Sequence, residues 1–202
     1  MNPATAVVGA WSRPSRLACL AGLGGLHIRP DGAGGRAWNL FSFDGALALR
    51  AWYPTVLPAP AVLHVSSPTG APVLSVSWSR KVPCCMIVRS GSGRDLGRVE
   101  EHASSGRLSL QIRDVSGAPR LEVLPFQVSP LDFACARLPP RRARRVALLQ
   151  RDLSSPQELT MQFQSRTLDL DEKALLVASG LLLLQASSRH CDGHQGSTSG
   201  AP

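Results

Sequence analysis

Residues Leu168–Ser188 read LDLDEKALLVASGLLLLQASS and differ in pattern from the rest of the chain. Leu, Ala and Lys favour helices. Asp169, Asp171 and Glu172 precede the apolar part, where acidic side chains stabilise a helix N-terminus through its dipole. After Lys173 no charge interrupts the segment. The sequence therefore predicts a helix over 168–188 that is hydrophobic on every side.

A helix that is hydrophobic all round is buried either in protein or in lipid. The uncharged run, residues 174–188, is shorter than the roughly 20 residues that cross a bilayer. Its length favours a core helix and leaves membrane insertion as the alternative. In either environment, the residues expected to make the buried contacts are Lys173, Leu175, Leu176, Leu181, Leu182, Leu183 and Leu184.

The chain before this helix is a series of short runs with alternating or β-branched side chains, which indicate strands. Gly- and Pro-containing turns separate them, at Asp44-Gly45, 68–70, 90–93 and 116–119. About twelve evenly spaced strands favour a sandwich or a closed barrel. A barrel of that size is too wide to fill with its own side chains. The predicted fold is therefore mainly β: a closed antiparallel barrel of about twelve strands around the C-terminal helix.

The composition fits one domain with an extension at each end. The chain has 202 residues, of which 44% are hydrophobic, and a net charge of +8. We expect a mobile N-terminal arm at 1–25, the barrel with its helix at 26–188, and a disordered tail at 189–202. The five cysteines form no CxxC pair, which favours free thiols and an intracellular setting.

Several segments, taken in order, resemble the phospholipid scramblases and, more loosely, the Tubby C-terminal-like fold. The segments are CLAGLGGLHI at 19–28, NLFSFDGALALRAW at 39–52, AVLHVSSPTGAPVLSVSW at 61–78 and the helix segment at 167–185. The chain is similar to a divergent and shortened member of that family.

The resemblance implies a twelve-stranded barrel around a C-terminal helix, at the cytoplasmic face of the plasma membrane. The implied activity is calcium-activated, energy-independent movement of phospholipids between leaflets, which is not an enzymatic reaction. No set of catalytic side chains stands out in the sequence. The alternative is a non-catalytic module of the same fold that binds anionic lipid or protein, with a nuclear location also open.

The family's acidic calcium loop corresponds here to residues 154–160, in which Glu158 is the one acidic residue. Calcium takes six to eight oxygen ligands, mostly from carboxylates. Glu158 is therefore at most a weak remnant of the site. We expect no competent calcium site and no other cofactor.

Cys84 and Cys85 stand where the family carries a cysteine cluster that is palmitoylated. By this resemblance the pair is a candidate double acylation site, because two acyl chains hold a protein on a membrane where one does not. The alternative is that both are small buried side chains of a strand.

Arg141, Arg142, Arg144 and Arg145 form the densest cluster of charge. They could attract anionic phospholipids, each contributing about 1 kcal/mol near a membrane surface. They could also serve nuclear import, bind nucleic acid, or form a solvated hairpin tip. Nucleic acid is the less favoured partner, because aromatic residues for base stacking are scarce, at 5% of the chain.

Overall fold

The computed structural model describes residues 16–32, 36–54, 62–79, 85–104, 107–126, 129, 131–138, 145–152, 154–155, 157–165 and 167–192. In this part of the chain a 3-10 turn, η1 (Ala18–Leu20), precedes the strands. The strands are β1 (Gly25–Pro30), β2 (Ala37–Ser42), β3 (Leu47–Trp52), β4 (Val62–Ser66), β5 (Pro72–Trp78), β6 (Cys85–Ser90), β7 (Asp95–Ser104), β8 (Arg107–Arg113), β9 (Pro119–Pro125), β10 (Asp132–Arg137), β11 (Arg145–Arg151) and β12 (Leu159–Phe163). The helix α1 (Leu170–Asp192) follows them.

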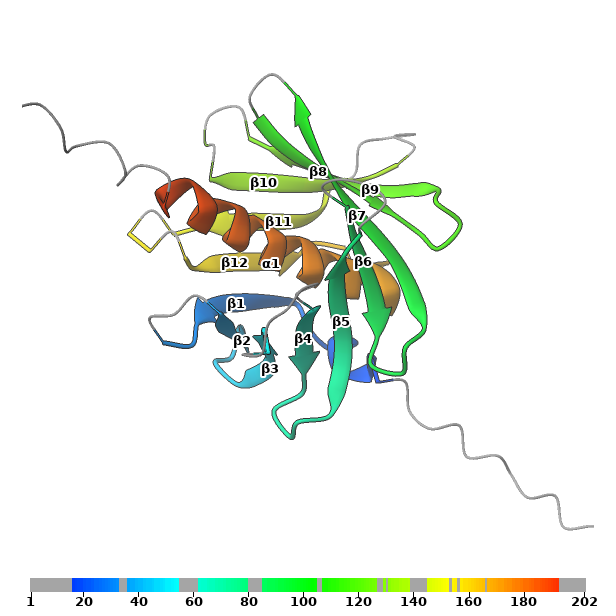
Figure 1. The fold of residues 1–202 in the computed structure, drawn as a ribbon, viewed down its shortest axis with the longest axis vertical. Helices are drawn as coiled ribbons and strands as arrows, with labels where there is room; N and C mark the ends of the chain where they lie inside the picture. Colours follow the sequence, from blue (N-terminus) through cyan, green and yellow to red (C-terminus); the bar gives the residue numbers. More distant parts are fainter. Residues whose placement is uncertain are drawn as a thin grey trace, which may run out of the picture.

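The strands close into one antiparallel barrel, in which each strand pairs with its neighbours in the sequence (Figure 1). β1 pairs with β2 on one side and with β12 on the other, which removes both sheet edges. The predicted fold class, a closed antiparallel barrel of about twelve strands around a C-terminal helix, is confirmed.

Side chains alternate between the inside and the outside of the barrel, as the period of a strand requires. In β3, Leu49 and Ala51 are buried while Arg50 and Trp52 are exposed. This alternation places every second residue of a strand on the outer surface, where polar and aromatic side chains can form a site.

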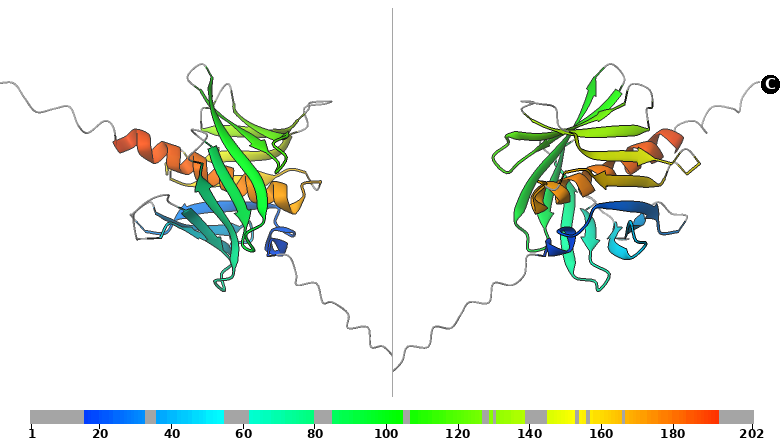
Figure 2. Two further views of the ribbon diagram at one scale, coloured as in Figure 1. Left: turned by 45° about the vertical axis from the view of Figure 1, so that its right-hand side comes forward. Right: turned by 180° about the vertical axis from the view of Figure 1, so that it is seen from behind.

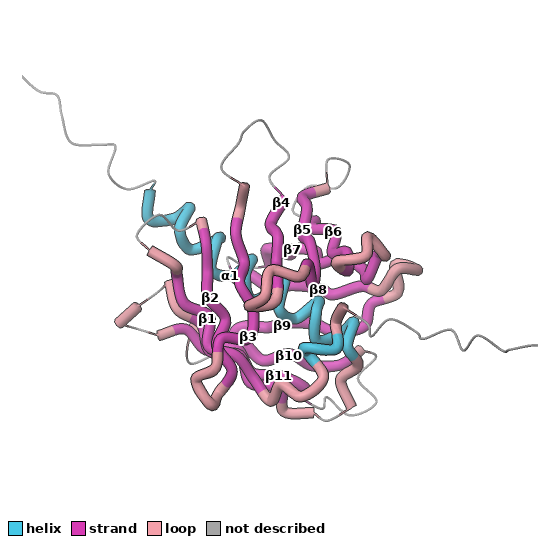
Figure 3. Tube along the Cα trace, turned by 90° about the horizontal axis from the view of Figure 1, so that it is seen from below, coloured by secondary structure: helices cyan, strands magenta, loops and turns pink. Residues whose placement is uncertain are grey.

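Helix α1 runs through the barrel, with strands on both sides of it (Figure 3). Residues 174–184 are buried, and their side chains are at most 3% exposed. The expected core residues Lys173, Leu175, Leu176, Leu181, Leu182, Leu183 and Leu184 are all buried. The helix is therefore the core of the barrel. Within the described residues, no helix has the length and apolarity needed to cross a membrane.

The acidic residues at the start of the helix stabilise its N-terminus, as the sequence suggests. Asp169 accepts a hydrogen bond from the backbone N–H of Glu172 (2.7 Å), and Glu172 accepts one from the N–H of Asp169 (3.1 Å). This reciprocal pair is a capping box, which satisfies N–H groups at the start of a helix. Arg94 holds Asp171 through two hydrogen bonds of 2.7 and 2.9 Å, and Arg137 holds Glu172 at 2.7 Å.

The expectation of a mobile arm over 1–25 is wrong for residues 16–25. Leu17 and Leu20 are buried at 1% and 0% exposure, and η1 lies beside the N-terminal end of α1 (Figure 2). The ammonium group of Lys173, itself 8% exposed, donates to the carbonyl oxygens of Leu20, Ala21 and Leu23, each at 3.0 Å. Residues 16–24 thus belong to the barrel.

The helix also continues beyond its expected end at residue 188, to Asp192, so the first residues of the expected tail are helical. The remaining parts of the expected arm and tail, 1–15 and 193–202, lie outside the described residues.

Candidate ligand-binding groove

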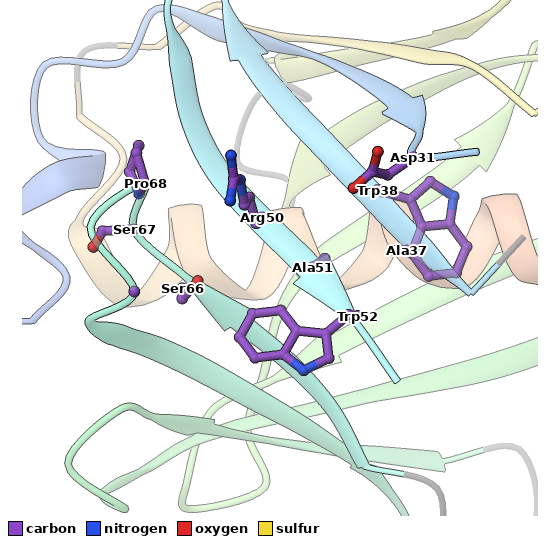
Figure 4. A pocket seen from close by; sticks show the side chains of 10 residues that line it. Asp31, Ala37, Trp38, Arg50, Ala51, Trp52, Ser66, Ser67 and Pro68 are labelled. Atoms are coloured by element: carbon purple, nitrogen blue, oxygen red, sulfur yellow. The ribbon is translucent and has the colours of Figure 1, made fainter. Parts of the chain in front are cut away.

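A pocket of about 350 Å³ lies where β1, β2, β3 and the β4–β5 turn approach one another (Figure 4). Arg50 and Trp52 come from the outward positions of β3, and Asp31 follows the end of β1. The full lining is Asp31, Ala37, Trp38, Arg50, Ala51, Trp52, Ser66, Ser67, Pro68 and Gly70. In Figure 4, Arg50 lies between Asp31 and the Ser66–Pro68 segment, and the helix runs behind the strands. The pocket therefore opens on the outer surface of the barrel.

A second pocket, of about 460 Å³, shares Trp52 and Gly70 with the first. Its lining includes the apolar residues Val65, Pro72 and Leu74 and the glycines of the β6–β7 turn. We call the two pockets together the Trp52 groove. The groove joins a polar pocket at Arg50 to a more apolar pocket over β4 and β5.

Strand register sets the geometry of the groove. Trp52 pairs with His64 across β3 and β4, and the two rings stack at a centroid distance of 5.9 Å and an interplanar angle of 29°. His64 in turn pairs with Ser75 of β5. In the next row, Arg50 pairs with Ser66. The small serine side chains beside Arg50 and His64 leave the space that forms the groove.

Arg50 and Asp31, the charged side chains of the polar pocket, are available to bind a ligand. Two other outward arginines are paired: Arg29 with Glu158 at 3.3 Å and Arg89 with Asp95 at 2.7 Å. Among the residues that the structure describes, neither Arg50 nor Asp31 forms an ion pair, with each other or with another side chain. A ligand that binds them has no internal ion pair to break.

The predicted arginine cluster is described in part. Arg141, Arg142 and Arg144 lie outside the described residues. Arg145 is exposed at the start of β11, with its guanidinium carbon 5.0 Å from the centroid of the Phe126 ring. Arg145 lies on β11 and Arg50 on β3, and these two strands are not neighbours in the barrel.

The predicted acylation pair is likewise described in part. Cys84 lies outside the described residues, and Cys85 is the first residue of β6, at 2% exposure. Burial and the neighbouring Glu100 carboxylate raise the pKa of the Cys85 thiol. Acylation of Cys85 would require the start of β6 to open, and it stays a prediction.

Thiol labelling checks this burial in a variant in which Cys84 and Cys191 are replaced by serine. We expect Cys19, which is exposed, to react quickly with a maleimide, while Cys85 and Cys135 react after unfolding. Cys135 is 0% exposed, and burial raises the pKa of its thiol. Mass spectrometry of peptides from timed samples gives the three rates. Labelling of Cys85 as fast as that of Cys19 would show that its thiol is open to acylation.

Glu158, the acidic residue that corresponds to the family's calcium loop, forms an ion pair with Arg29. Its carboxylate lies 3.3 Å from Nε of Arg29. Among the described residues, no group of three or more His, Cys, Asp or Glu side chains could hold a metal ion. The expectation that calcium does not bind stays a prediction.

Sequence reasoning did not select Arg50, Trp52 or Asp31 as site residues. One local signal was present, because Arg50 and Trp52 alternate with the apolar Leu49 and Ala51 and so share the outer face. The contribution of Asp31 and of the β4–β5 turn depends on strand order and register, which no local pattern contains.

Comparisons with known proteins support the fold. A structure search finds the X-ray structure of a protein from Arabidopsis thaliana with a TM-score of 0.56 and 12% identity, covering 82% of this chain and 91% of that chain. No family model and no curated protein matches the chain. The likeness concerns the fold alone.

Proposed function

We propose that this protein is a membrane-associated module that binds phospholipid headgroups in the Trp52 groove and catalyses no reaction. The observation that carries the proposal is Arg50, which has no ion-pair partner in the described part of the chain, beside the partly exposed Trp52 on the outer surface. Arginine presents N–H donors in a fork that matches the oxygens of a phosphate. Tryptophan has an apolar body and a polar N–H, which suits the boundary between membrane and water.

The arginine cluster at residues 141–145 complements the groove in this proposal. It attracts anionic phospholipids over distance, without selecting a headgroup. The groove then binds one headgroup in a defined orientation. The expected location is the cytoplasmic face of a membrane, and the partner is the membrane surface.

Phospholipid movement between leaflets, which the family resemblance implies, is the second candidate function. It is favoured by the fold, which is the one that the resemblance implies. Calcium control is not supported by the groove or by Glu158, whose carboxylate is paired with Arg29. If the protein moves lipid, we propose that it does so without calcium.

Vesicle co-sedimentation tests headgroup binding. We expect the double variant Arg50→Gln/Trp52→Ala to bind vesicles of phosphatidylcholine with phosphatidylserine at least about tenfold more weakly, since tenfold corresponds to about 1.4 kcal/mol. Arg120→Gln is the matched control, because Arg120 is an exposed arginine of β9 whose side chain is 58% accessible. Equal binding by the double variant and the control would contradict the proposal.

A leaflet assay with fluorescent phospholipid in the same vesicles separates the two candidate functions. Binding without movement of the label, with and without calcium, supports the headgroup-binding module. Movement of the label that is lost in the Arg50→Gln/Trp52→Ala variant supports lipid transport through the groove.

A further inference from the structure

The polar pocket of the Trp52 groove contains one positive and one negative side chain, Arg50 and Asp31. Both line the same pocket, yet no ion pair joins them. The other described residues of the lining are uncharged. The net charge of the pocket is therefore close to zero. A polyanionic headgroup would meet Asp31 as a repulsive charge, so a pocket of this kind selects against it.

The third element of the pocket is the ring of Trp52, which is 38% exposed. His64 stacks against this ring, which holds it in place beside Arg50. The face of an indole attracts organic cations, and quaternary ammonium groups are recognised by such rings. A carboxylate nearby adds a Coulombic attraction for the same cation.

We infer that the ligand of the groove is a zwitterionic headgroup, in which a phosphate is linked to an ammonium group, as in phosphocholine and phosphoethanolamine. Arg50 binds the phosphate, and Asp31 and the Trp52 ring receive the ammonium group. This inference rests on the proposed function and specifies its ligand class.

The size of the groove agrees with this assignment. The polar pocket, at about 350 Å³, lies at the lower end of the range for small-molecule sites, which is roughly 300–1,000 Å³. It suits a headgroup better than a whole phospholipid. The adjoining pocket, in whose lining Trp52, His64 and Pro72 are accessible, is placed to receive the less polar glycerol part of the same molecule.

Removing the charge of Asp31 tests the inference, because it should weaken binding to a zwitterionic headgroup and should not weaken binding to an anionic one. We expect Asp31→Asn to weaken binding to vesicles of phosphatidylcholine alone at least about fivefold, because the ammonium group loses its carboxylate. On vesicles of phosphatidylglycerol, which has no ammonium group, the same variant should bind equally or more tightly. Arg50→Gln should weaken binding to both, and Arg120→Gln is again the control. Circular dichroism confirms that each variant is folded.

Two other results have distinct meanings. Unchanged or tighter binding of Asp31→Asn to phosphatidylcholine vesicles would overturn the zwitterion assignment, while the proposed function stands as long as Arg50→Gln weakens binding. If Arg50→Gln and the control bind both kinds of vesicle equally, the groove is not the headgroup site, and the proposed function fails with the inference.

Discussion

Replacing Lys173 with methionine will lower the free energy of unfolding by about 3 kcal/mol, because three backbone carbonyl oxygens lose a charged donor at once. Nζ of Lys173 lies 3.0 Å from each of the oxygens of Leu20, Ala21 and Leu23. Burial lowers the pKa of Lys173, so the ammonium form depends on these acceptors. Methionine keeps a similar unbranched shape and removes the donors. Urea denaturation followed by circular dichroism measures the change.

The matched control is Arg16→Met. Arg16 also donates to a backbone carbonyl, that of Gly91, but its side chain is exposed and makes a single contact of this kind. We expect this change to cost less than about 1 kcal/mol. Hydrogen exchange should show that Lys173→Met loosens residues 16–24 more than the strands. A Lys173→Met protein with wild-type stability would mean that the carbonyl contacts do not hold η1 in place.

Replacing Gly180 with leucine will destabilise the barrel by about 3 kcal/mol or more, which is the upper part of the range for overpacked cores. Gly180 lies on a side of α1 that faces residues of β12 and β1. A Cβ at this position would lie 2.6 Å from Cε of Met161 and 2.9 Å from Cδ2 of Leu159. A whole leucine side chain would force these β12 side chains, or the helix itself, out of their packed positions. Thermal and urea unfolding measure the loss.

Two further variants make the Gly180 result specific. Gly22→Leu adds the same side chain where nothing lies within 4 Å of the new Cβ, so its stability should remain close to wild type. Adding Met161→Ala to Gly180→Leu should recover part of the lost stability, because the truncation opens space for the new side chain, and such neighbouring changes are not additive. Full additivity would show that the two positions do not compete for the same volume.

The fold could be predicted because each of its parts has a local pattern. Alternation marks the strands, the glycine turns separate them, and residues 168–188 have no polar face. Strand β7, which runs over Asp95–Ser104, follows this pattern least well. Glu101 and His102 continue it although both are polar, because their backbones pair with Leu110 and Ser109 of β8.

The contacts of η1 could not be predicted because their partners are backbone atoms far along the chain. Lys173 was expected to be buried, but its acceptors, three carbonyl groups, have no signature in the sequence. The groove was missed for a related reason. Arg50 and Trp52 are recognisable as outward residues of one strand, but only the register of β1 to β5 shows that Asp31 and the β4–β5 turn complete a pocket around them.

The position of α1 after all twelve strands has a consequence for synthesis on the ribosome. The strands emerge first, each with an apolar inner face and nothing yet to cover it. The barrel also cannot close until β12 has been made, because β12 is the partner of β1. The nascent protein must therefore stay unfolded or loosely collapsed until its last apolar segment is released. Incomplete chains with exposed apolar surface are prone to aggregation. We therefore expect this barrel to fold after translation and to depend on chaperones while it is being synthesised.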